Sequence, residues 1–383
     1  MTSSRQSKRI VLLGIGHTNA HVVREWGRRP IPGCELACIS NYAESTYSGM
    51  LPAVLAGQIP EQKMQIDLPA LCQRVGAQLR LGNVVELKPA TNELVFADGG
   101  ELEFDVLSVG IGSIPSTQGM TLVDEACLAI KPMQTFLDRL TQRLDRLRFQ
   151  KGSNPIWINI IGGGVAGCEV ACCLDQRFRT MTAGVFRLRL IHGAEELLGN
   201  ESQGLKTRMR AELDRRKVEL VLGRNVREVN LGHIYLDDGR QLESDLSLIV
   251  TGASAPPLLG HFGLPVDNDG FLQTDACLQS TSGRPIFAVG DTGSIVDQRV
   301  PKAGVYAVRQ GPVLWENIHR LVEGRSLIPF RPQKSFLKLI NLGDGRAAGE
   351  WQGISFSGRW VMFLKSAIDG AFVAKFETTP QRV

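Results

Sequence analysis

The sequence has 383 residues, a length that suits two to three domains of ordinary size. Its 43% hydrophobic and 21% charged content is that of a globular protein, and it has no run of 18 apolar residues that would predict a membrane-spanning helix. The net charge is only +4, and residues 331–383, with eight basic and four acidic side chains, account for all of it, which argues against nucleic acid as a partner.

The predicted chain begins with a polar tail at residues 1–8 and a strand at residues 9–13. The tail lacks the apolar core of a signal peptide, which predicts a disordered tail and a cytoplasmic protein. A glycine turn, Gly14-x-Gly16, and a predicted helix follow the strand. This order opens a nucleotide-binding βαβ unit, in which the helix N-terminus presents free N–H groups to phosphates.

The first turn departs from the GxGxxG pattern at its third glycine, where Asn19 stands. We expect the neighbouring Ala20 to permit close packing of helix on strand. The next predicted strand ends at Ser40 and Asn41, which replace the acid that usually binds a ribose and can still hydrogen-bond one. Residues 46–52, TYSGMLP, contain no cysteine, although some proteins with such turns carry a redox-active pair here.

A second copy of the same plan begins with the predicted strand at residues 156–161, IWINII. The complete turn Gly162-x-Gly164-x-x-Gly167 follows and opens a predicted helix, a context that makes the motif specific. Each copy also has a hairpin predicted at an Asp-Gly dipeptide, at residues 98–99 and 238–239, because such pairs supply the positive φ of a tight turn. The sequence therefore predicts two dinucleotide-binding units.

The strand after the second turn ends at His192, with no acid to favour NAD over NADP. Both NADH and NADPH stay open, and His192 is a candidate weak donor to a phosphate. Glu169 has two interpretations, an acid that complements the dipole of the helix or a group where a nicotinamide meets a flavin. We expect Arg187 and Arg189, on one face of the strand, to be exposed to solvent.

A third segment places a short strand at residues 286–289 before Gly290-Asp291. Asp291 is either a turn cap or an acceptor for the ribityl hydroxyls of a flavin. A helix is expected to begin at Pro301, and Lys302 is either an exposed lysine or a positive charge beside a reduced flavin. The last fifty residues predict strands around an Asp-Gly turn at residues 344–345 and then a helix.

Five stretches in order, GIGHTNA, VGIGSIP, GGGVAGCE, VTGAS and RPIFAVGD, resemble the FAD-dependent pyridine nucleotide-disulfide oxidoreductases over roughly residues 9–325. Residues 300–318 resemble a helix that type II NADH dehydrogenases and sulfide:quinone reductases place against the flavin. Together with residues 46–60 they resemble most the flavoprotein module fused in front of selenide, water dikinase in some organisms.

This resemblance implies an α/β fold with two Rossmann-like, three-layer ββα domains, the second inserted in the first, and a small C-terminal α+β segment. The implied boundaries are residues 9–118 and 256–328 for an FAD-binding domain, 119–255 for an NAD(P)H-binding domain, and 329–383 for the C-terminal segment. We expect that last segment to cover the flavin domain or to form a homodimer interface, with a peripheral membrane contact as the alternative.

Together, motifs and resemblance imply FAD and either NADH or NADPH as cofactors, and Glu169 and Lys302 as catalytic residues. No metal site is predicted, because no His or Cys residues stand in ligand spacing. The residues expected to bind the cofactors are Gly14, Gly16, His17, Asn19, Ala20, Ser40, Asn41, Ser48, Met50, Leu51, Pro52, Val84, Gly110, Gly112, Gly162, Gly164, Val165, Ala166, Gly167, His192, Gly252, Gly290, Asp291, Lys302 and Ala303.

These features predict an oxidoreductase that passes hydride from NAD(P)H to FAD and then electrons to a quinone or small-molecule acceptor, without a protein disulfide. Two alternatives stay open. A sulfide- or selenide-linked flavoprotein oxidoreductase needs a cysteine near the flavin, and Cys127 is the one candidate. A non-catalytic flavin-binding partner subunit would keep the turns as vestiges.

Overall fold

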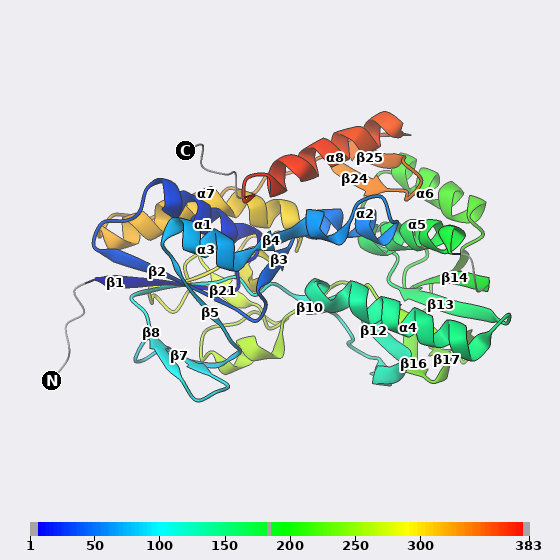
Figure 1. Cartoon of the computed structure of the whole chain (residues 1–383), viewed down its shortest axis with the longest axis horizontal. Helices are drawn as coiled ribbons and strands as arrows, with labels where there is room; N and C mark the ends of the chain where they lie inside the picture. The colour runs from blue at the N-terminus through cyan, green and yellow to red at the C-terminus, as the bar shows by residue number, and fades with distance from the viewer. Residues whose placement is uncertain (1–6, 182–184, 378–383) are drawn as a thin grey trace.

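The computed structural model describes residues 7–181 and 185–377, and it has two lobes of similar architecture spanned by a C-terminal segment (Figure 1). Strand β1 already begins at Lys8, inside the stretch expected to be a disordered tail. The rest of that expectation, residues 1–6, lies outside the described residues.

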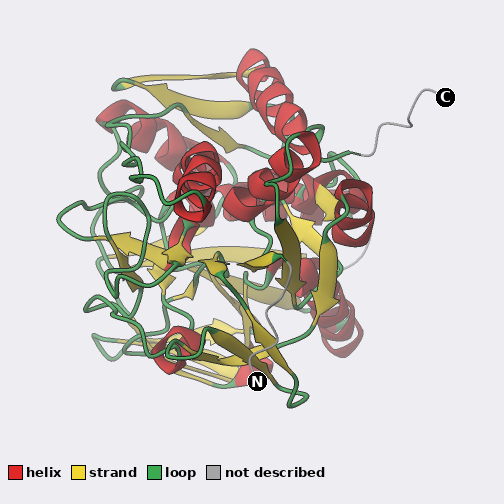
Figure 2. Cartoon of the chain, turned by 90° about the vertical axis from the view of Figure 1, so that its left-hand side faces the viewer, coloured by secondary structure: helices red, strands yellow, loops and turns green. Residues whose placement is uncertain are grey.

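The first lobe contains a five-stranded parallel sheet in the order β22-β9-β1-β2-β5. Its strands are β1 (Lys8–Leu13), β2 (Cys34–Ser40), β5 (Gln78–Leu81), β9 (Val106–Val109) and β22 (Ile286–Ala288). The helices gather on one side of the sheet, and an antiparallel meander covers the other (Figures 1 and 2). These elements are α1 (His17–Arg28), α3 (Leu68–Val75), α7 (Gly304–Val322), β6 (Val84–Lys88), β7 (Glu93–Phe96) and β8 (Glu101–Glu103).

The second lobe repeats this plan with a parallel sheet in the order β12-β19-β13-β14-β15. Its strands are β12 (Cys127–Ala129), β13 (Pro155–Ile161), β14 (Val185–His192), β15 (Glu219–Leu222) and β19 (Leu246–Ile249). The covering elements are α4 (Phe136–Lys151), α5 (Val165–Thr180), α6 (Gln203–Arg215), β11 (Thr121–Leu122), β16 (Val226–Asn230), β17 (Gly232–Leu236) and β18 (Gln241–Ser244). The predicted duplication and the α/β class are confirmed.

Short elements connect the lobes and shape the space between them. They are β3 (Glu44–Thr46), β4 (Gln65–Asp67), α2 (Leu51–Leu55), β10 (Ile114–Pro115), β20 (Ala253–Ser254), β21 (Leu272–Thr274) and β23 (Gly293–Ile295). Strand β10 pairs with β20, so the chain leaves and re-enters the first lobe at one place. Helix α2 belongs to the first half of the sequence, but its apolar side chains pack in the core of the second lobe.

Two equivalent aspartates show how closely the lobes correspond. The carboxylate of Asp105 accepts the backbone N–H of Arg9 at 2.6 Å, and that of Asp245 accepts the N–H of Trp157 at 2.8 Å. Each aspartate precedes the strand next to the first strand of its unit. The repeated aspartates of the sequence are therefore structural, since each ties together the start of two parallel strands.

Two expectations for the elements are wrong. Helix α7 begins at Gly304 rather than at Pro301, because Ala303 is its N-cap with an extended backbone (φ −142°, ψ 143°). Arg189 is buried rather than exposed: it donates to the carboxylate of Glu219, its register partner on β15, at 2.9 Å, and its guanidinium lies 4.2 Å from the ring centroid of Trp157.

The C-terminal segment joins the two lobes. An antiparallel sheet of β24 (Lys338–Asn341), β25 (Ala347–Trp351) and β26 (Ile354–Gly358) lies against α5 and α6 of the second lobe. Helix α8 (Arg359–Val373) then runs back, so that Phe372 and Val373 enter the core of the first lobe. The predicted strands and helix are confirmed, and the segment covers the junction between the lobes (Figure 1).

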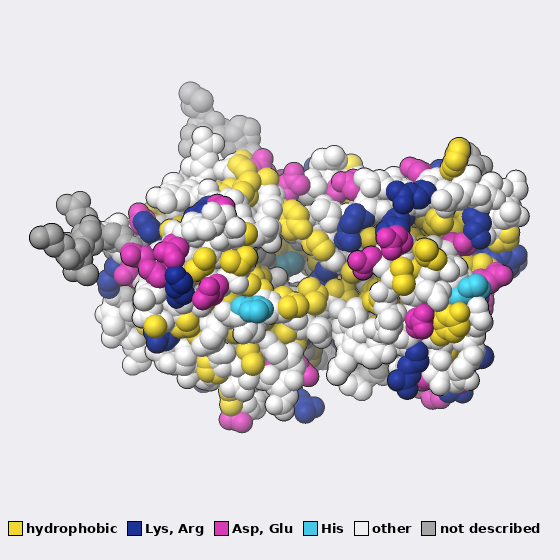
Figure 3. All heavy atoms as spheres, turned by 90° about the horizontal axis from the view of Figure 1, so that it is seen from below, with side chains coloured by type: hydrophobic (Ala, Val, Ile, Leu, Met, Phe, Trp, Pro, Cys, Tyr) yellow, Lys and Arg dark blue, Asp and Glu magenta, His cyan; other side chains and the backbone are white. Residues whose placement is uncertain are grey.

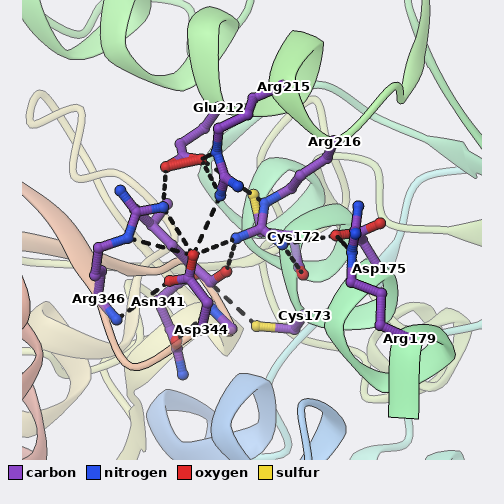
Figure 4. A network of polar contacts seen from close by, with 12 residues as sticks. Cys172, Cys173, Asp175, Arg179, Glu212, Arg215, Arg216, Asn341, Asp344 and Arg346 are labelled. Carbon is purple, nitrogen blue, oxygen red and sulfur yellow. Dashed lines mark hydrogen bonds and ion pairs between the residues drawn. The ribbon is translucent and has the colours of Figure 1, made fainter. Parts of the chain in front are cut away.

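A buried arginine fixes the C-terminal sheet to the second lobe (Figure 4). Arg216 is 5% exposed and donates to the carboxylates of Asp175 at 2.7 Å and Asp344 at 3.1 Å, and to the carbonyl oxygen of Leu342 at 2.6 Å. Asp344 also binds Arg346 at 2.7 Å. One guanidinium thus links α5, the end of α6 and the β24–β25 turn.

We expect Arg216→Met to lower the free energy of unfolding by about 2–3 kcal/mol, because it leaves two half-buried carboxylates and a carbonyl oxygen without their shared donor. Urea titration of the FAD-bound protein measures this. Arg210→Met is the matched control: its pair with Asp214 is exposed and contributes about 0.5 kcal/mol or less. Equal unfolding midpoints for the two variants would contradict the structural importance of Arg216.

Candidate flavin and nucleotide site

A cavity of ≈ 690 Å³ lies between the lobes and receives residues from both of them. The surface is hollowed there, with hydrophobic side chains along its rim (Figure 3). Of the expected site residues, the cavity is lined by Gly14, Gly16, His17, Asn19, Ser40, Asn41, Ser48, Leu51, Pro52, Val84, Gly110, Gly112, Ala166, Glu169, Gly290, Asp291, Lys302 and Ala303. It is not lined by Ala20, Met50, Gly162, Gly164, Val165, Gly167, His192 or Gly252.

The first glycine turn forms one end of this cavity. Gly14 has φ +80°, and a side-chain carbon on it would lie 2.6 Å from the carbonyl oxygen of Gly110. Asn19 holds the turn, since its Nδ2 donates to the carbonyl oxygen of Gly14 at 2.7 Å and its Oδ1 accepts from Ser108 Oγ at 2.7 Å. Asn19, at the position of the missing third glycine, thus ties the start of α1 to the turn, while Ala20 is buried in the core of the lobe.

Three side chains surround the place where the ribose of a dinucleotide is expected. Ser40 Oγ donates to the carbonyl oxygen of Tyr42 at 2.8 Å, which leaves it less free than the sequence predicted. Asn41 has no side-chain partner among the described residues. Glu44, on β3, also lines the cavity and supplies an acid four residues beyond the strand end. The sequence pattern did not indicate Glu44, because the acid that binds a ribose is expected at the end of the strand itself.

A polar cluster lies where the flavin ribityl chain is expected. Asp291 accepts from Ser113 Oγ at 2.7 Å, and Lys131 Nζ lies 2.7 Å from Ser113 Oγ and 3.5 Å from Asp291. The carboxylate of Asp291 makes no capping hydrogen bond to its own turn, so the turn-cap interpretation is not supported. Lys131 was not predicted. The pattern that could have indicated it is a lysine two residues after a short strand, near the place that Asp291 holds in the first lobe.

Glu169 ends inside the protein, beside the C-terminal segment. It accepts the backbone N–H of Asn341 at 2.7 Å, and its carboxylate lies 4.0 Å from Lys365 Nζ. Lys365 in turn pairs with Asp369 at 2.9 Å, and Tyr47 donates to Asp369 at 3.1 Å. The chain Glu169–Lys365–Asp369–Tyr47 therefore leads from the cavity, which Glu169 lines, through two residues of α8 to Tyr47.

Burial shifts the proton affinities in this chain. It raises the pKa of Glu169 above its usual range, although Lys365 and the N–H of Asn341 act in the opposite direction. For Lys365, burial alone would lower the pKa, but Glu169 and Asp369 together outweigh burial and raise it. Burial thus raises the pKa of the Glu169 carboxyl, a shift that is common among acid–base groups in active sites.

Lys302 lines the cavity but does not extend freely into it. Its ammonium donates to the carbonyl oxygen of Gly293 at 2.6 Å and lies 3.9 Å from the ring centroid of Phe271. Burial lowers its pKa. Lys302 therefore braces the loop before α7, and its expected charge near a flavin stays a prediction.

In the second glycine turn, the backbone lies in close contact with a neighbouring strand end and with the start of α5. Gly162 has φ +122°, and a side chain on it would overlap the backbone of Val250. A side chain on Gly167 would overlap the carbonyl oxygen of Gly162, so the helix start and the turn touch directly. His192 Nδ1 accepts the N–H of Gly163 at 3.2 Å, which places the imidazole proton on Nε2 and leaves that atom as a donor. Ala166 and Glu169, on the same helix, reach the flavin cavity.

No cysteine lines the flavin cavity. Cys127 lines a separate cavity of ≈ 720 Å³ between α4 and the linker, where burial raises its pKa to about 11. Cys127, the candidate for a thiol near the flavin, therefore does not line this cavity, because it begins β12 whereas Ile130 and Lys131, beyond the other end of that strand, line the cavity. In residues 7–181 and 185–377 no group of three or more His, Cys, Asp or Glu could hold a metal ion.

The residues present fit FAD. The cavity extends from a phosphate-binding turn at Gly14 to an acid at Asp291, and two buried polar atoms on its walls, His17 Nε2 and Thr46 Oγ1, have no partner among the described residues. A bound cofactor with ring and hydroxyl polar atoms would satisfy such groups. Within the described part of the chain, no helix is long and apolar enough to cross a membrane.

Comparison with known proteins agrees with this geometry. The family model of pyridine nucleotide-disulphide oxidoreductases matches residues 8–311. A demethylphylloquinone reductase of Synechocystis is 27% identical over 263 residues, which are 67% of this chain and 63% of that protein, so the chain spans less than two thirds of it. A type II NADH:quinone oxidoreductase of Staphylococcus epidermidis is 22% identical, covering 97% of this chain and 96% of the relative.

Among solved structures, the sulfide:quinone oxidoreductase of Aquifex aeolicus superposes with a TM-score of 0.80 at 16% identity, over 97% of this chain and 91% of that one. At this identity the likeness concerns the fold alone. The names of these three proteins mention quinones and sulfide and no selenium compound.

Proposed function

The chain belongs to the pyridine nucleotide-disulphide oxidoreductase family, and we propose that it is an FAD-dependent enzyme that oxidises NADH or NADPH and reduces a quinone. The observation that carries the proposal is one cavity that joins the first glycine turn to Ala166 and Glu169, on the helix of the second turn. When bound, FAD would supply the two-electron step between nucleotide and acceptor. The names of two relatives, a demethylphylloquinone reductase and a type II NADH:quinone oxidoreductase, support a quinone as the acceptor.

Each lobe would bind one cofactor through its glycine turn. In the first lobe, the N–H groups at the start of α1 would hold the pyrophosphate, Asn41 and Glu44 the ribose, and Asp291 the ribityl hydroxyls. In the second lobe, the start of α5 would hold the nucleotide pyrophosphate, with His192 nearby as a donor. Residues 9–118 and 256–328 would thus form the FAD domain, and residues 119–255 the NAD(P)H domain.

The chain's own residues would manage the protons of the reaction. Quinone reduction consumes protons as well as electrons, and the protein must deliver them in a site that excludes water. Glu169, whose pKa burial raises, would exchange a proton at the cavity wall, and Lys365 and Asp369 connect it to Tyr47. No cysteine is needed for this route.

A sulfide- or selenide-linked oxidoreductase is the second candidate, and the fold of the Aquifex protein is the observation that favours it. Such an enzyme needs a thiolate beside the flavin, whereas Cys127 lies in another cavity with a raised pKa. Sulfide should therefore leave the flavin of the purified protein oxidised.

Anaerobic titration of the purified yellow protein tests the proposed function. We expect NADH or NADPH to bleach the flavin absorption and menadione, a naphthoquinone, to restore it. A flavin that stays oxidised with both nucleotides would reject the enzyme and favour a flavin-binding partner subunit. Bleaching by sulfide would favour the second candidate.

We further propose that the outer face of α8 and the β25–β26 hairpin rest on a membrane surface, from which a quinone would enter. The face carries Trp360, Phe363 and Ile354, with exposures of 58%, 77% and 71%. The charged residues in the middle of α8, Lys365 and Asp369, point inward. Aromatic side chains on a helix without exposed acids in a basic segment suit an anionic lipid surface better than a second copy of the same chain.

We expect the double variant Trp360→Ser/Phe363→Ser to bind vesicles of anionic phospholipid at least about tenfold more weakly, because it removes two interfacial aromatic rings. Flotation with vesicles measures the binding. Phe149→Ser is the control, since Phe149 is 92% exposed on α4, outside this face. If light scattering instead shows a dimer that the double variant disrupts, while vesicles are not bound, the face is a homodimer interface.

A further inference from the structure

The second cavity of the protein, which contains Cys127, has no role in the proposed reaction. It lies between residues 117–129 and helix α4, which runs beside β12 (Figure 1). Its volume of ≈ 720 Å³ is within the usual range for cavities that bind small molecules. Three arginines of α4 line it, and it is called the arginine cavity below.

The three arginines form one wall of the arginine cavity. Arg139, Arg143 and Arg146 stand about one turn apart along α4, so they lie on the same face of the helix. Among the described residues, no carboxylate lies within 4.0 Å of any of them. Asp124 is the one acid among the described residues that line the cavity. Most of the positive charge in the lining therefore has no counter-charge within the protein.

Backbone carbonyl groups hold two of these guanidinium groups in place. Arg143 donates to the carbonyl oxygen of Glu125 at 2.6 Å, and Arg139 to that of Ala129 at 3.2 Å. A guanidinium has more N–H groups than these bonds use, so both side chains keep donors that no described residue accepts. Arg146 makes no hydrogen bond with a described residue. The wall thus presents fixed, unused donors to a bound anion, whose carboxylate or phosphate oxygens match the planar guanidinium.

The rest of the arginine cavity is mainly aliphatic. Met120, Leu122, Leu128 and Ile249 line it, and no aromatic side chain among the described residues does. Burial raises the pKa of Cys127 to about 11, so its thiol is uncharged at neutral pH. An aliphatic surface binds a hydrocarbon chain through the hydrophobic effect, whereas a nucleobase is commonly stacked on an aromatic ring. The lining therefore favours an aliphatic body over a nucleotide.

The arginine cavity and the flavin cavity share one segment of chain. Ala129 lines the first, and residues 130–132 line the second. Arg139 donates to the carbonyl oxygens at both ends of this segment, those of Ala129 and Pro132, at 3.2 Å each. Between them, Lys131 reaches Asp291, where the flavin ribityl chain is expected. An anion on the free N–H groups of Arg139 would hold the guanidinium, and with it this segment, more firmly.

We propose that the arginine cavity binds a small molecule with an anionic head group, a carboxylate or a phosphate, on an aliphatic body, and that its occupancy stabilises the segment carrying Lys131 and slows the release of FAD. The head group accepts hydrogen bonds from the three arginines, and the body covers the aliphatic lining. Coupling of this kind is reciprocal, so bound FAD also tightens the binding of the anion. The inference requires that the chain binds FAD and is independent of the proposed electron acceptor.

Calorimetric titration of the FAD-bound protein tests the class of ligand. The probes are octanoate and octyl phosphate, which carry both parts, 1-octanol, which lacks the charge, and inorganic phosphate, which lacks the chain. We expect the first two to bind at least about tenfold more tightly than the last two, because each part contributes a charge-assisted hydrogen bond or buried methylene groups. Octanoate that binds no more tightly than 1-octanol would overturn the proposal.

Substitution of the arginines tests the location. We expect Arg143→Gln and Arg146→Gln each to weaken octanoate binding about tenfold, since each removes a charged donor. Arg139 is left unchanged, because it holds the segment beside the flavin. Arg227→Gln is the matched control: Arg227 is an exposed arginine of the same lobe and does not line the cavity. If Arg143→Gln does not fold, the exposed Arg146→Gln carries the test by the same criterion.

Photolabelling separates this site from the exposed aromatic face of α8. An aliphatic carboxylate with a diazirine in its chain is cross-linked to the FAD-bound protein, and the labelled peptides are identified by mass spectrometry. We expect labels in residues 117–129 or in α4, and fewer of them in Arg146→Gln. Labels confined to α8 and the β25–β26 hairpin would assign the binding to that face and contradict the proposal.

The release of FAD tests the coupling. Release is followed by flavin fluorescence in urea below the unfolding transition, with and without saturating octanoate. We expect octanoate to slow release about fivefold or more in the unmodified protein, and at the same concentration to have a smaller effect in Arg146→Gln. An equal rate of release with and without octanoate in the unmodified protein would overturn the link between the two cavities.

Discussion

Gly167→Ala is expected to reduce the rate of flavin bleaching by NADH or NADPH about 100-fold or more while the protein keeps its FAD. A single methyl group at this position would overlap the carbonyl oxygen of Gly162, so the start of α5 must move away from the turn. Displacement by about 1 Å at a site that aligns two reacting rings costs about 100-fold in rate. Anaerobic stopped-flow bleaching at saturating nucleotide measures the effect.

The predicted selectivity of Gly167→Ala follows from the duplication. The first lobe has its own turn and its own hydrophobic core, so its FAD content, read from the visible absorption, should not change. Gly260→Ala is the control, since a side chain there has no heavy atom within 4 Å. If the variant loses both its bound FAD and the bleaching reaction, it is unfolded. Bleaching at the normal rate would mean that NAD(P)H does not bind at this turn.

Local patterns identified the two lobes because glycine turns and hairpins depend on neighbouring residues. The turns at Gly14 and Gly162 need positive φ and close backbone contact, which only glycine tolerates. The positions of these glycines in the sequence therefore predict the turns. The parallel strands around them are short apolar runs. The insertion of one unit in the other was implied by the family resemblance that the order of these patterns carries.

Contacts between distant segments could not be read in the same way. Lys131 meets Asp291 from 160 residues away, and Asn341 meets Glu169 from 172 residues away. No local pattern marks Lys365, whose position on α8 suggested only an amphipathic helix. Cys127 was misplaced for the same reason, because the strand that carries it joins a sheet whose neighbour, β19, is more than a hundred residues later. Burial of such polar residues depends on which elements meet, and only the folded chain shows this.

Glu169→Gln is expected to reduce turnover with menadione about 100-fold, the usual contribution of a positioned acid–base group. Glutamine can still accept the N–H of Asn341, so the fold should persist, but it cannot exchange a proton. Because burial raises the pKa of Glu169, turnover that needs its protonated form should fall as pH rises through a value above the usual carboxyl range. The variant should lack this decline. Glu125→Gln, on an exposed side chain, should keep the profile.

Lys365→Met is expected to be more harmful than Glu169→Gln, and the two changes together less harmful than their sum. Among residues 7–181 and 185–377, Lys365 is the one cation within 4.0 Å of both Glu169 and Asp369, so its loss leaves two buried carboxyl groups without a described counter-charge. Such a loss costs about 3–5 kcal/mol in stability. Neutralising Glu169 in the double variant removes half of that cost. A double-mutant cycle, measured on unfolding and on turnover, gives the coupling free energy between Glu169 and Lys365. We expect about 1 kcal/mol or more if the pair acts as one unit. Additive effects would mean that Glu169 works independently of α8.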